Sequence, residues 1–279
     1  MKCLHILLIL GVIIPSSYAS TVCLDKEKKE LGTHQRQRKR RNGRATRNFF
    51  SSVAQDVIDL NKNIFTWDSL KVAAIVLPFY VGSRMIDEEL QSCFYDPRHH
   101  KNVNPMPDWC HAAAKWGITA PIIFFGAQAF LSTNEDMRQT SRIFLLGLPF
   151  VIWAKNILKE VHFDANLRPW HEKYSCVKRA YGGFPSGHMA EATYATVLFG
   201  LRFGPRVAVP LGVLAAFVGG TFVTCNRHYL SQVVAGAGLG IIYALAANKV
   251  VDSKFSESVE IGLTSNKYGG TSLSLTYHF

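Results

Sequence analysis

Beyond residue 49, the chain alternates long apolar segments with short polar loops. The loops carry turn and helix-breaking residues, such as Asn134, Glu135 and Asp136 in one and Phe203, Gly204 and Pro205 in another. The pattern predicts an all-α, six-helix bundle. The predicted helical segments are Val72–Gly82, Gly117–Leu131, Ile143–Ala154, Met189–Phe203, Val207–Cys225 and Tyr229–Ala247.

The lengths of these segments bear on their relation to a membrane. Most are 11 to 15 residues long, and the last two are 19. Because a helix needs about 20 apolar residues to cross a bilayer, most of these lengths suit buried core helices better than complete spans. A membrane-embedded bundle and a bundle lying on a membrane both stay open. Glycines in the last two segments are expected to permit close helix approach; they are Gly219, Gly220, Gly236, Gly238 and Gly240.

The end of the chain has a different pattern, in which apolar and polar residues alternate on both sides of the turn at residues 266–270. Alternation of this kind predicts a short C-terminal β-hairpin. A terminal Phe279 is also typical of the last strand of an outer-membrane barrel, but one hairpin cannot close a barrel. We therefore expect the hairpin to pack on the bundle or on another subunit.

The first 19 residues have the pattern of a secretory signal peptide, with Lys2 before an apolar run and Ala19 at the cleavage position. An uncleaved anchor is the alternative, although the run is shorter than a full span. Residues 20–48 form a basic arm with too few apolar residues to fold alone. We expect four parts: signal peptide 1–19, flexible arm 20–48, helical domain 49–252 and hairpin 253–279.

Charge is concentrated in that arm. The chain has a net charge of +11, and residues 25–48 hold ten Lys or Arg against three acids. The folded part is therefore only mildly basic, which argues against nucleic acid as a partner. The arm is interpreted as a solvated tail, with attraction to anionic lipid head groups as the alternative. A hydrophobic content of 48% excludes a disordered protein, whereas the mean hydropathy of +0.07 does not decide whether the chain spans a membrane.

The cysteines do not indicate a catalytic or metal-binding site. Five cysteines remain if the signal peptide is removed, so at least one thiol has no partner within the chain. The sequence has no C-x-x-C pair, which argues against a thiol redox centre or a structural zinc site.

The most informative stretch is Gly182-Gly183-Phe184-Pro185-Ser186-Gly187-His188, which runs directly into a predicted helix. Ser186 is expected at the helix N-terminus, and Gly187 would let the backbone approach a ligand closely. Unpaired N–H groups and the positive end of the helix dipole make such a terminus a phosphate-binding site.

Two flanking segments complete a pattern: Arg168-Pro169 stands before the stretch, and His228 precedes the last helix. The arrangement resembles the type 2 phosphatidic acid phosphatase superfamily, which includes class A bacterial acid phosphatases and vanadium haloperoxidases. Its pattern is Lys, six residues, Arg-Pro; then Pro-Ser-Gly-His; then Ser-Arg, five residues, His, three residues, Asp. The resemblance covers about Lys155 to Gly240, and its middle motif is complete.

The resemblance implies a role for each matching residue. Arg168 would bind phosphate oxygens together with Ser186 and the Gly187 amide, His188 would be the general acid, and His228 would be the nucleophile. The implied reaction passes through a phosphohistidine. It needs no metal or other cofactor, because fixed cations and amide dipoles stabilise the phosphoryl charge.

The first motif departs from the family pattern. The position seven residues before Arg168 is Val161, and the candidate lysines are Lys159 and Lys155, at nine and thirteen residues before it. An insertion around residues 164–166 would restore Lys159. It requires the helix to break there, since nine residues on an unbroken helix are half a turn out of phase.

The third motif departs at two positions. Phe222 stands where the family has Arg, and loss of one such donor typically costs about 3–4 kcal/mol of transition-state stabilisation. Compensation could come from Arg227, Lys178 or Arg179. Gln232 stands where an Asp would orient the nucleophile; its amide oxygen can still accept the His228 N–H, but it brings no negative charge.

The sequence thus predicts an exported phosphatase, in the periplasm or the envelope membrane with its site outside the cytoplasm. Its substrate would be a phosphomonoester or diphosphate of a lipid, and a small phosphate ester is the other partner class. The alternative is a catalytically impaired family member that binds phosphorylated lipid or has a structural role in the envelope. Vanadate-dependent halide oxidation would use the same pocket but has no further support in the sequence.

Overall fold

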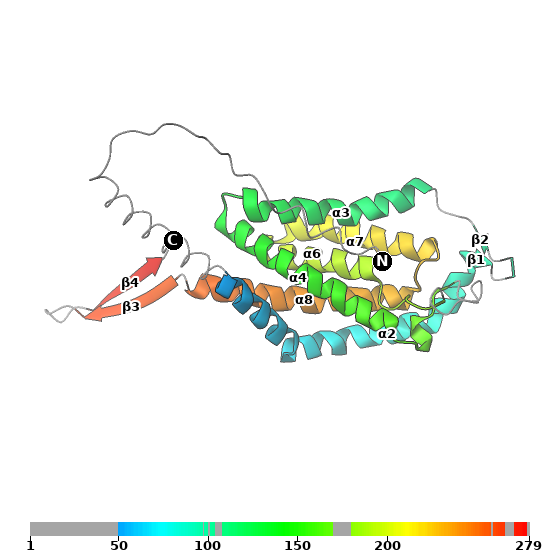
Figure 1. The fold of residues 1–279 in the computed structure, drawn as a ribbon, viewed down its shortest axis with the longest axis horizontal. Helices are drawn as coiled ribbons and strands as arrows, with labels where there is room; N and C mark the ends of the chain where they lie inside the picture. The colour runs from blue at the N-terminus through cyan, green and yellow to red at the C-terminus, as the bar shows by residue number, and fades with distance from the viewer. Residues whose placement is uncertain are drawn as a thin grey trace, which may run out of the picture. The chain divides into compact units, whose positions relative to one another are not determined.

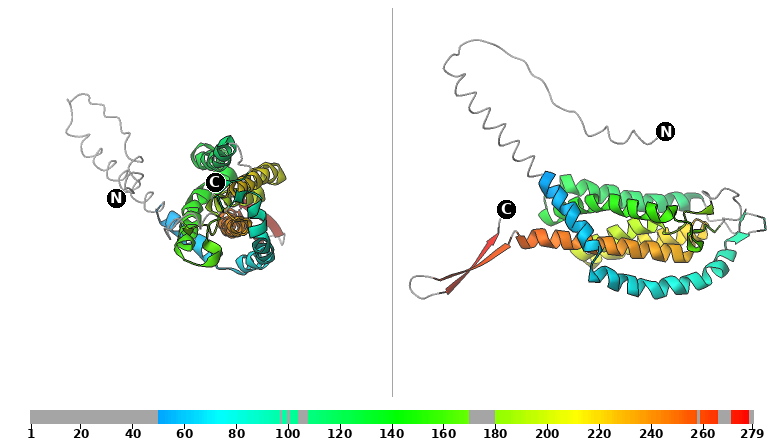
Figure 2. Two further views of the ribbon diagram at one scale, coloured as in Figure 1. Left: turned by 90° about the vertical axis from the view of Figure 1, so that its right-hand side faces the viewer. Right: turned by 60° about the horizontal axis from the view of Figure 1, so that its bottom comes forward.

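A computed structural model describes residues 50–96, 98–99, 101–103, 108–169, 180–257, 259–265 and 271–277. The signal segment and the basic arm of the sequence prediction lie outside the described residues, as do Lys178, Arg179 and the turn at residues 266–270. Figures 1 and 2 show that the described part is a bundle of long helices, followed by two strands.

Each of the six predicted helical segments falls on a helix, which confirms the helical bundle. The helices are α2 (Trp67–Ser92), α3 (Asp108–Leu131), α4 (Glu135–Glu160), α6 (Gly187–Phe203), α7 (Pro205–Thr224) and α8 (Leu230–Glu257). A further helical stretch at residues 50–64 precedes α2, and a 3-10 turn, η1 (Asp164–Asn166), follows α4. Strands β1 (Tyr95–Asp96) and β2 (Lys101–Asn102) pair antiparallel, as do β3 (Val259–Ser265) and β4 (Thr271–Tyr277).

The predicted helix lengths were wrong, because most helices continue well beyond their apolar runs. Helix α4 has 26 residues and begins at Glu135, where the sequence pattern had indicated a loop. Asn134 caps this helix by accepting the Met137 N–H at 3.0 Å. Glu135 and Asp136 occupy its first turn, where the helix dipole favours negative charge. The loop at Gly204 is confirmed: α6 ends at Phe203, Gly204 has a φ of +78°, and Pro205 begins α7.

Four of the described helices, α2, α4, α7 and α8, are long and apolar enough to cross a membrane. Helix α2 carries large exposed apolar side chains along its length, including Phe79 and Met85, and Trp153 of α4 is similarly exposed. Exposed apolar surface of this extent indicates an apolar partner or a lipid environment.

The core lies around α6, which contacts α3, α4, α7 and α8. Phe144 of α4 stacks on Tyr194 of α6 with ring centroids 5.2 Å apart, and both side chains are fully buried. A Cβ at Gly236 of α8 would collide with the Ser186 carbonyl oxygen, so this glycine lets α8 pack directly against the start of α6. The predicted role in close approach was wrong for Gly220, where a Cβ would meet no atom within 4 Å.

Candidate active site

The Ser186 side chain occupies the position expected of a phosphate ligand. Ser186 is the N-cap of α6 and is 1% exposed, and its backbone N–H donates to the Gln232 carbonyl oxygen at 2.9 Å. Its hydroxyl makes no capping hydrogen bond and is buried with no hydrogen-bond partner among the described residues. A buried polar group of this kind is costly unless a ligand or water pairs with it.

Lys155 of α4 lies directly beside the start of α6. A Cβ at Gly187 would come within 2.6 Å of the Lys155 Nζ, so the absence of a side chain at Gly187 makes room for the ammonium group. Lys155 also forms an ion pair with Glu191, one turn further along α6. The ammonium group and the helix N-terminus together attract anions.

His228 lies in the loop before α8 and is 4% exposed. Its Nδ1 is 2.9 Å from the Gly183 carbonyl oxygen and 3.3 Å from Oε1 of Gln232. Since both neighbours are acceptors, Nδ1 carries the proton and donates it, which leaves the Nε2 lone pair available for nucleophilic attack. These two acceptors therefore fix the tautomer of His228 without the Asp of the family pattern.

Gln232 is held in one orientation by its own hydrogen bonds. Its Nε2 donates to the carbonyl oxygens of Ala165 at 2.9 Å and Leu167 at 2.6 Å. Because the amide nitrogen faces these two acceptors, the amide oxygen must face His228, and it also accepts the Tyr229 N–H at 3.2 Å. Gln232 thus connects the start of α8 to the 3-10 turn η1.

Asn166 joins the same turn to two other parts of the site, and sequence analysis missed it. Its side chain is buried and donates to the Lys159 carbonyl oxygen at 2.9 Å, at the end of α4. Its Oδ1 accepts the Phe184 N–H at 2.8 Å, and its carbonyl accepts the Gly183 N–H at 2.9 Å. A single Asn in a polar loop gives no sequence signal of this role. The role of the Gly183 carbonyl as a neighbour of His228 Nδ1 has no sequence signal either.

The helix break on which the Lys159 assignment depended is present. Helix α4 ends at Glu160, and the chain turns through η1 before Arg168, so the helical phase argument does not apply across this segment. The Arg168 Nε donates to the Tyr181 carbonyl oxygen at 3.1 Å. Burial first, and then the charges of Lys159 and Arg168, lower the pKa of His228 to about 3. Of the two lysine candidates, Lys155 thus lies beside Gly187, and the charge of Lys159 acts on His228.

An aromatic ring occupies the position where the family has an arginine. Phe222 is 3% exposed, and its ring stacks on His188 with centroids 4.4 Å apart and lies 6.1 Å from the His228 ring. The two histidines therefore come from different helix starts and share one apolar neighbour. Burial lowers the pKa of His188 to about 4, partly opposed by Glu191. Arg227, one candidate replacement for the missing cation, is exposed.

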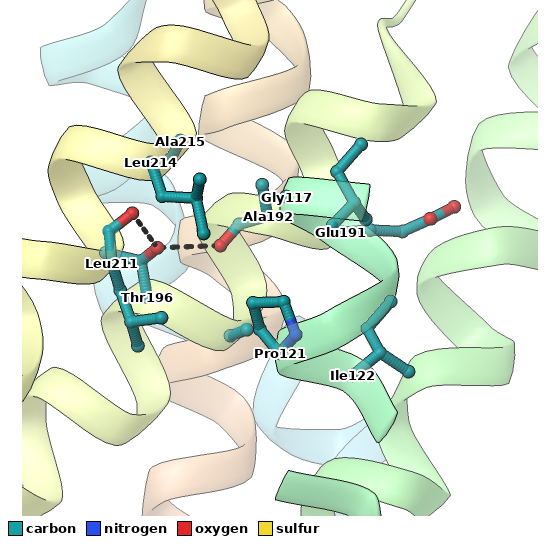
Figure 3. Close-up of a pocket in the computed structure, with 11 residues that line it drawn as sticks. Gly117, Pro121, Ile122, Glu191, Ala192, Thr196, Leu211, Leu214 and Ala215 are labelled. Atoms are coloured by element: carbon teal, nitrogen blue, oxygen red, sulfur yellow. Dashed lines mark hydrogen bonds between the residues drawn. The ribbon is translucent and has the colours of Figure 1, made fainter. Parts of the chain in front are cut away.

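A small cavity lies between α3, α6 and α7, and Glu191 is one of the residues that line it (Figure 3). Its lining is mostly apolar, and the Thr196 hydroxyl is hydrogen-bonded to the carbonyl oxygens of Ala192 and Leu211. The Glu191 side chain points away from Thr196 in this view. The described residues contain no group of three or more His, Cys, Asp or Glu that could hold a metal ion.

Three comparisons show which known proteins this chain resembles. A sequence model of the PAP2 superfamily matches residues 162–256, which include Arg168, Ser186, His188 and His228. A 66-residue segment is 38% identical to lipid A 1-phosphatase of Porphyromonas gingivalis; it covers 23% of this chain and only 15% of that protein. The crystal structure of the first transmembrane PAP2 type phosphatidylglycerolphosphate phosphatase from Bacillus subtilis matches with a TM-score of 0.46 and 17% identity, over 69% of this chain and 98% of that one. The family model thus places the similarity to the PAP2 superfamily in residues 162–256, about a third of the chain.

Proposed function

We propose that the chain is a membrane-embedded phosphatase that hydrolyses the phosphate ester of a lipid through a phosphohistidine on His228. The observation that carries the proposal is the fixed tautomer of His228, whose Nδ1 faces the Gly183 carbonyl and the Gln232 amide oxygen. A histidine held in this way presents Nε2 as a nucleophile at neutral pH.

In the proposed reaction, Nε2 of His228 attacks phosphorus in line, and the bond from phosphorus to the lipid oxygen breaks. His188 donates its proton to the departing oxygen. A bound phosphate dianion would raise the low pKa of His188, because the negative charge favours the imidazolium. Neutral His188 then accepts a proton from the water that attacks the phosphohistidine, and inorganic phosphate leaves.

The residues around the phosphate would act by charge and by hydrogen bonding. Arg168, Lys155 and Lys159 would neutralise the phosphoryl oxygens, while the Ser186 hydroxyl and the Gly187 amide would donate hydrogen bonds to them. When phosphate binds, Lys155 would exchange part of its interaction with Glu191 for the ligand. None of these steps needs a metal ion.

A lipid substrate is supported by the four helices that can cross a membrane and by the exposed apolar surface of α2. The lipid A 1-phosphatase that resembles part of this chain acts, by its name, on a phosphorylated lipid. We place the site at the membrane surface outside the cytoplasm, in keeping with the signal peptide expected at residues 1–19.

The test is phosphate release from dihexadecanoyl phosphatidic acid in detergent micelles, with p-nitrophenyl phosphate as a soluble substrate. We expect His228→Ala to abolish release from both substrates. With phosphatidic acid labelled with radioactive phosphate, the wild-type chain should yield an acid-labile, base-stable phosphoenzyme after rapid denaturation, and His228→Ala should not. Release that His228→Ala leaves unchanged would refute the proposal.

A second candidate function is lipid-phosphate binding without turnover, and the replacement of the family arginine by Phe222 favours it. It predicts that the wild-type chain binds vesicles containing phosphatidic acid more tightly than vesicles of phosphatidylcholine alone, with no phosphate release. Release above the level of His228→Ala would exclude this candidate.

A further inference from the structure

An apolar groove lies between α2 and α8, and most of its lining is outside the motifs of the site. It has a volume of about 340 Å³. Its long walls are five residues of α2, from Val72 to Tyr80, and four residues of α8, from Ala235 to Ile242. Helices α2 and α8 are neighbours in the bundle, as Figure 2 shows in cyan and orange.

One end of the groove adjoins the phosphate-binding residues. Its lining there includes Leu158, Phe184 and Pro185. Leu158 immediately precedes Lys159, and Pro185 immediately precedes Ser186. The rings of Tyr80 and Phe184 meet edge to face at 5.9 Å. A ligand that lies in the groove at this end is therefore next to the anion-binding start of α6.

The other end of the groove leads away from the site along both helices. From Tyr80 back to Val72 is eight residues, or about 12 Å along the helix axis. Gly238 lies on the α8 side, where a Cβ would come within 2.9 Å of Val76 Cγ1, so this glycine brings the two helices together. The groove thus runs along both helices, and the residues next to Lys159 and Ser186 lie at one end of it.

The apolar side chains that line the groove indicate what kind of ligand it can bind. Apart from the Tyr80 hydroxyl, every side chain in the lining is apolar, so a sugar or nucleotide would lose its hydrogen bonds to water and gain few in return. Both α2 and α8 are long and apolar enough to cross a membrane, so a groove between them opens towards hydrocarbon if the chain is embedded. A molecule with a phosphate at one end and a hydrocarbon chain at the other matches both features.

We propose that the α2–α8 groove binds a hydrocarbon chain of the lipid whose phosphate lies at Ser186 and His228. This proposal rests on the proposed phosphatase function, since it uses the same phosphate site. The proposal implies that the protein selects its substrate by the length of the lipid's hydrocarbon chain as well as by the phosphate.

Filling the groove tests the proposal. Ala73 and Ala74 are both exposed on α2, but only Ala73 is part of the groove lining. We expect Ala73→Trp to lower kcat/KM for dihexadecanoyl phosphatidic acid at least tenfold and to leave p-nitrophenyl phosphate hydrolysis unchanged. The matched control Ala74→Trp should change neither. Unchanged hydrolysis of the soluble substrate also establishes that the variant is folded. An equal loss for both substrates, or no loss for the lipid, would overturn the proposal.

A second measurement separates this proposal from the phosphatase function itself. If the wild-type chain hydrolyses neither substrate, the proposed function fails, and photo-crosslinking with a diazirine-bearing hexadecanoyl phosphatidic acid still tests the groove. Labelling concentrated on α2 and α8, reduced by Ala73→Trp and not by Ala74→Trp, would support the groove. Labelling spread evenly over the apolar surfaces of α3, α4 and α7 would overturn it.

Discussion

The carboxylate of Asp87 on α2 accepts hydrogen bonds from both the backbone N–H and the hydroxyl of Ser231 in the first turn of α8. The N–H bond is 3.0 Å long, and Asp87 is 1% exposed. Arg84 lies 3.5 Å from the same carboxylate and also pairs with Asp164 in the η1 turn. A buried carboxylate from another helix thus stabilises the start of α8, three residues after His228 and next to Gln232.

We predict that Asp87→Ala lowers both thermal stability and turnover. The change leaves the Ser231 N–H and hydroxyl without their acceptor, which lowers the free energy of unfolding by about 1–3 kcal/mol for a buried group. It also removes the ion pair of Asp87 with Arg84. Because the start of α8 positions His228, we expect kcat to fall more than KM rises. Thermal unfolding in detergent and steady-state kinetics measure the two effects. The control is Glu88→Ala, an exposed neighbouring acid that should be silent, and equal effects of the two variants would contradict the prediction.

The helices of the bundle could be predicted from the sequence because their apolar runs and breakers are local signals. The stretch at residues 50–64 was missed, although Val53, Val57, Leu60 and Ile64 follow a helical spacing and Leu60 is buried. Helix ends were missed where capping chemistry and polar first turns, as at Asn134 and Glu135, extend a helix beyond its apolar face.

Site residues could be predicted from the sequence only where several of them are consecutive and form one motif. Ser186, Gly187 and His188 belong to such a motif, and the structure brings them to the start of α6 as expected. Asp87 and Asn166 act over 144 and 18 residues of sequence, so their partners are set by the packing of the bundle. A backbone acceptor, such as the Gly183 carbonyl, leaves no mark on side-chain identity at all.

Gln232 gives a prediction that runs against the family pattern. Gln232→Asp introduces the family residue, but its shorter side chain has no donor for the Ala165 and Leu167 carbonyl oxygens. We therefore expect a lower melting temperature and no gain in phosphatase activity. Gln232→Asn, which keeps the amide at the shorter length, separates the effect of length from that of charge. A Gln232→Asp variant with raised kcat and unchanged stability would show that the amide contacts are dispensable.

Phe222 allows a test of the missing cation. Its ring packs against Ala114, Ile118 and Val218, so Phe222→Arg would bury a charge in an apolar cluster, which costs several kcal/mol unless an anion pairs with it. We expect this variant to melt at a lower temperature than the wild type. Sulfate should recover more of the melting temperature in this variant than it adds to the wild type. Phe222→Leu is the control without charge, and an equal sulfate response in both variants would place position 222 away from the anion.

The two histidines make the stability of the chain depend on pH. Burial lowers the pKa of His188 to about 4 and that of His228 to about 3, whereas an unfolded histidine titrates near 6.5. Below about pH 6.5 the unfolded state therefore binds protons that the folded site does not, so the free energy of unfolding falls as the pH falls from about 6.5 to about 4. Melting temperatures in detergent between pH 7.5 and 4.5 measure this slope. The slope should be shallower in the His188→Gln, His228→Gln double variant. Equal slopes in the wild type and the double variant would mean that these two rings do not carry the effect.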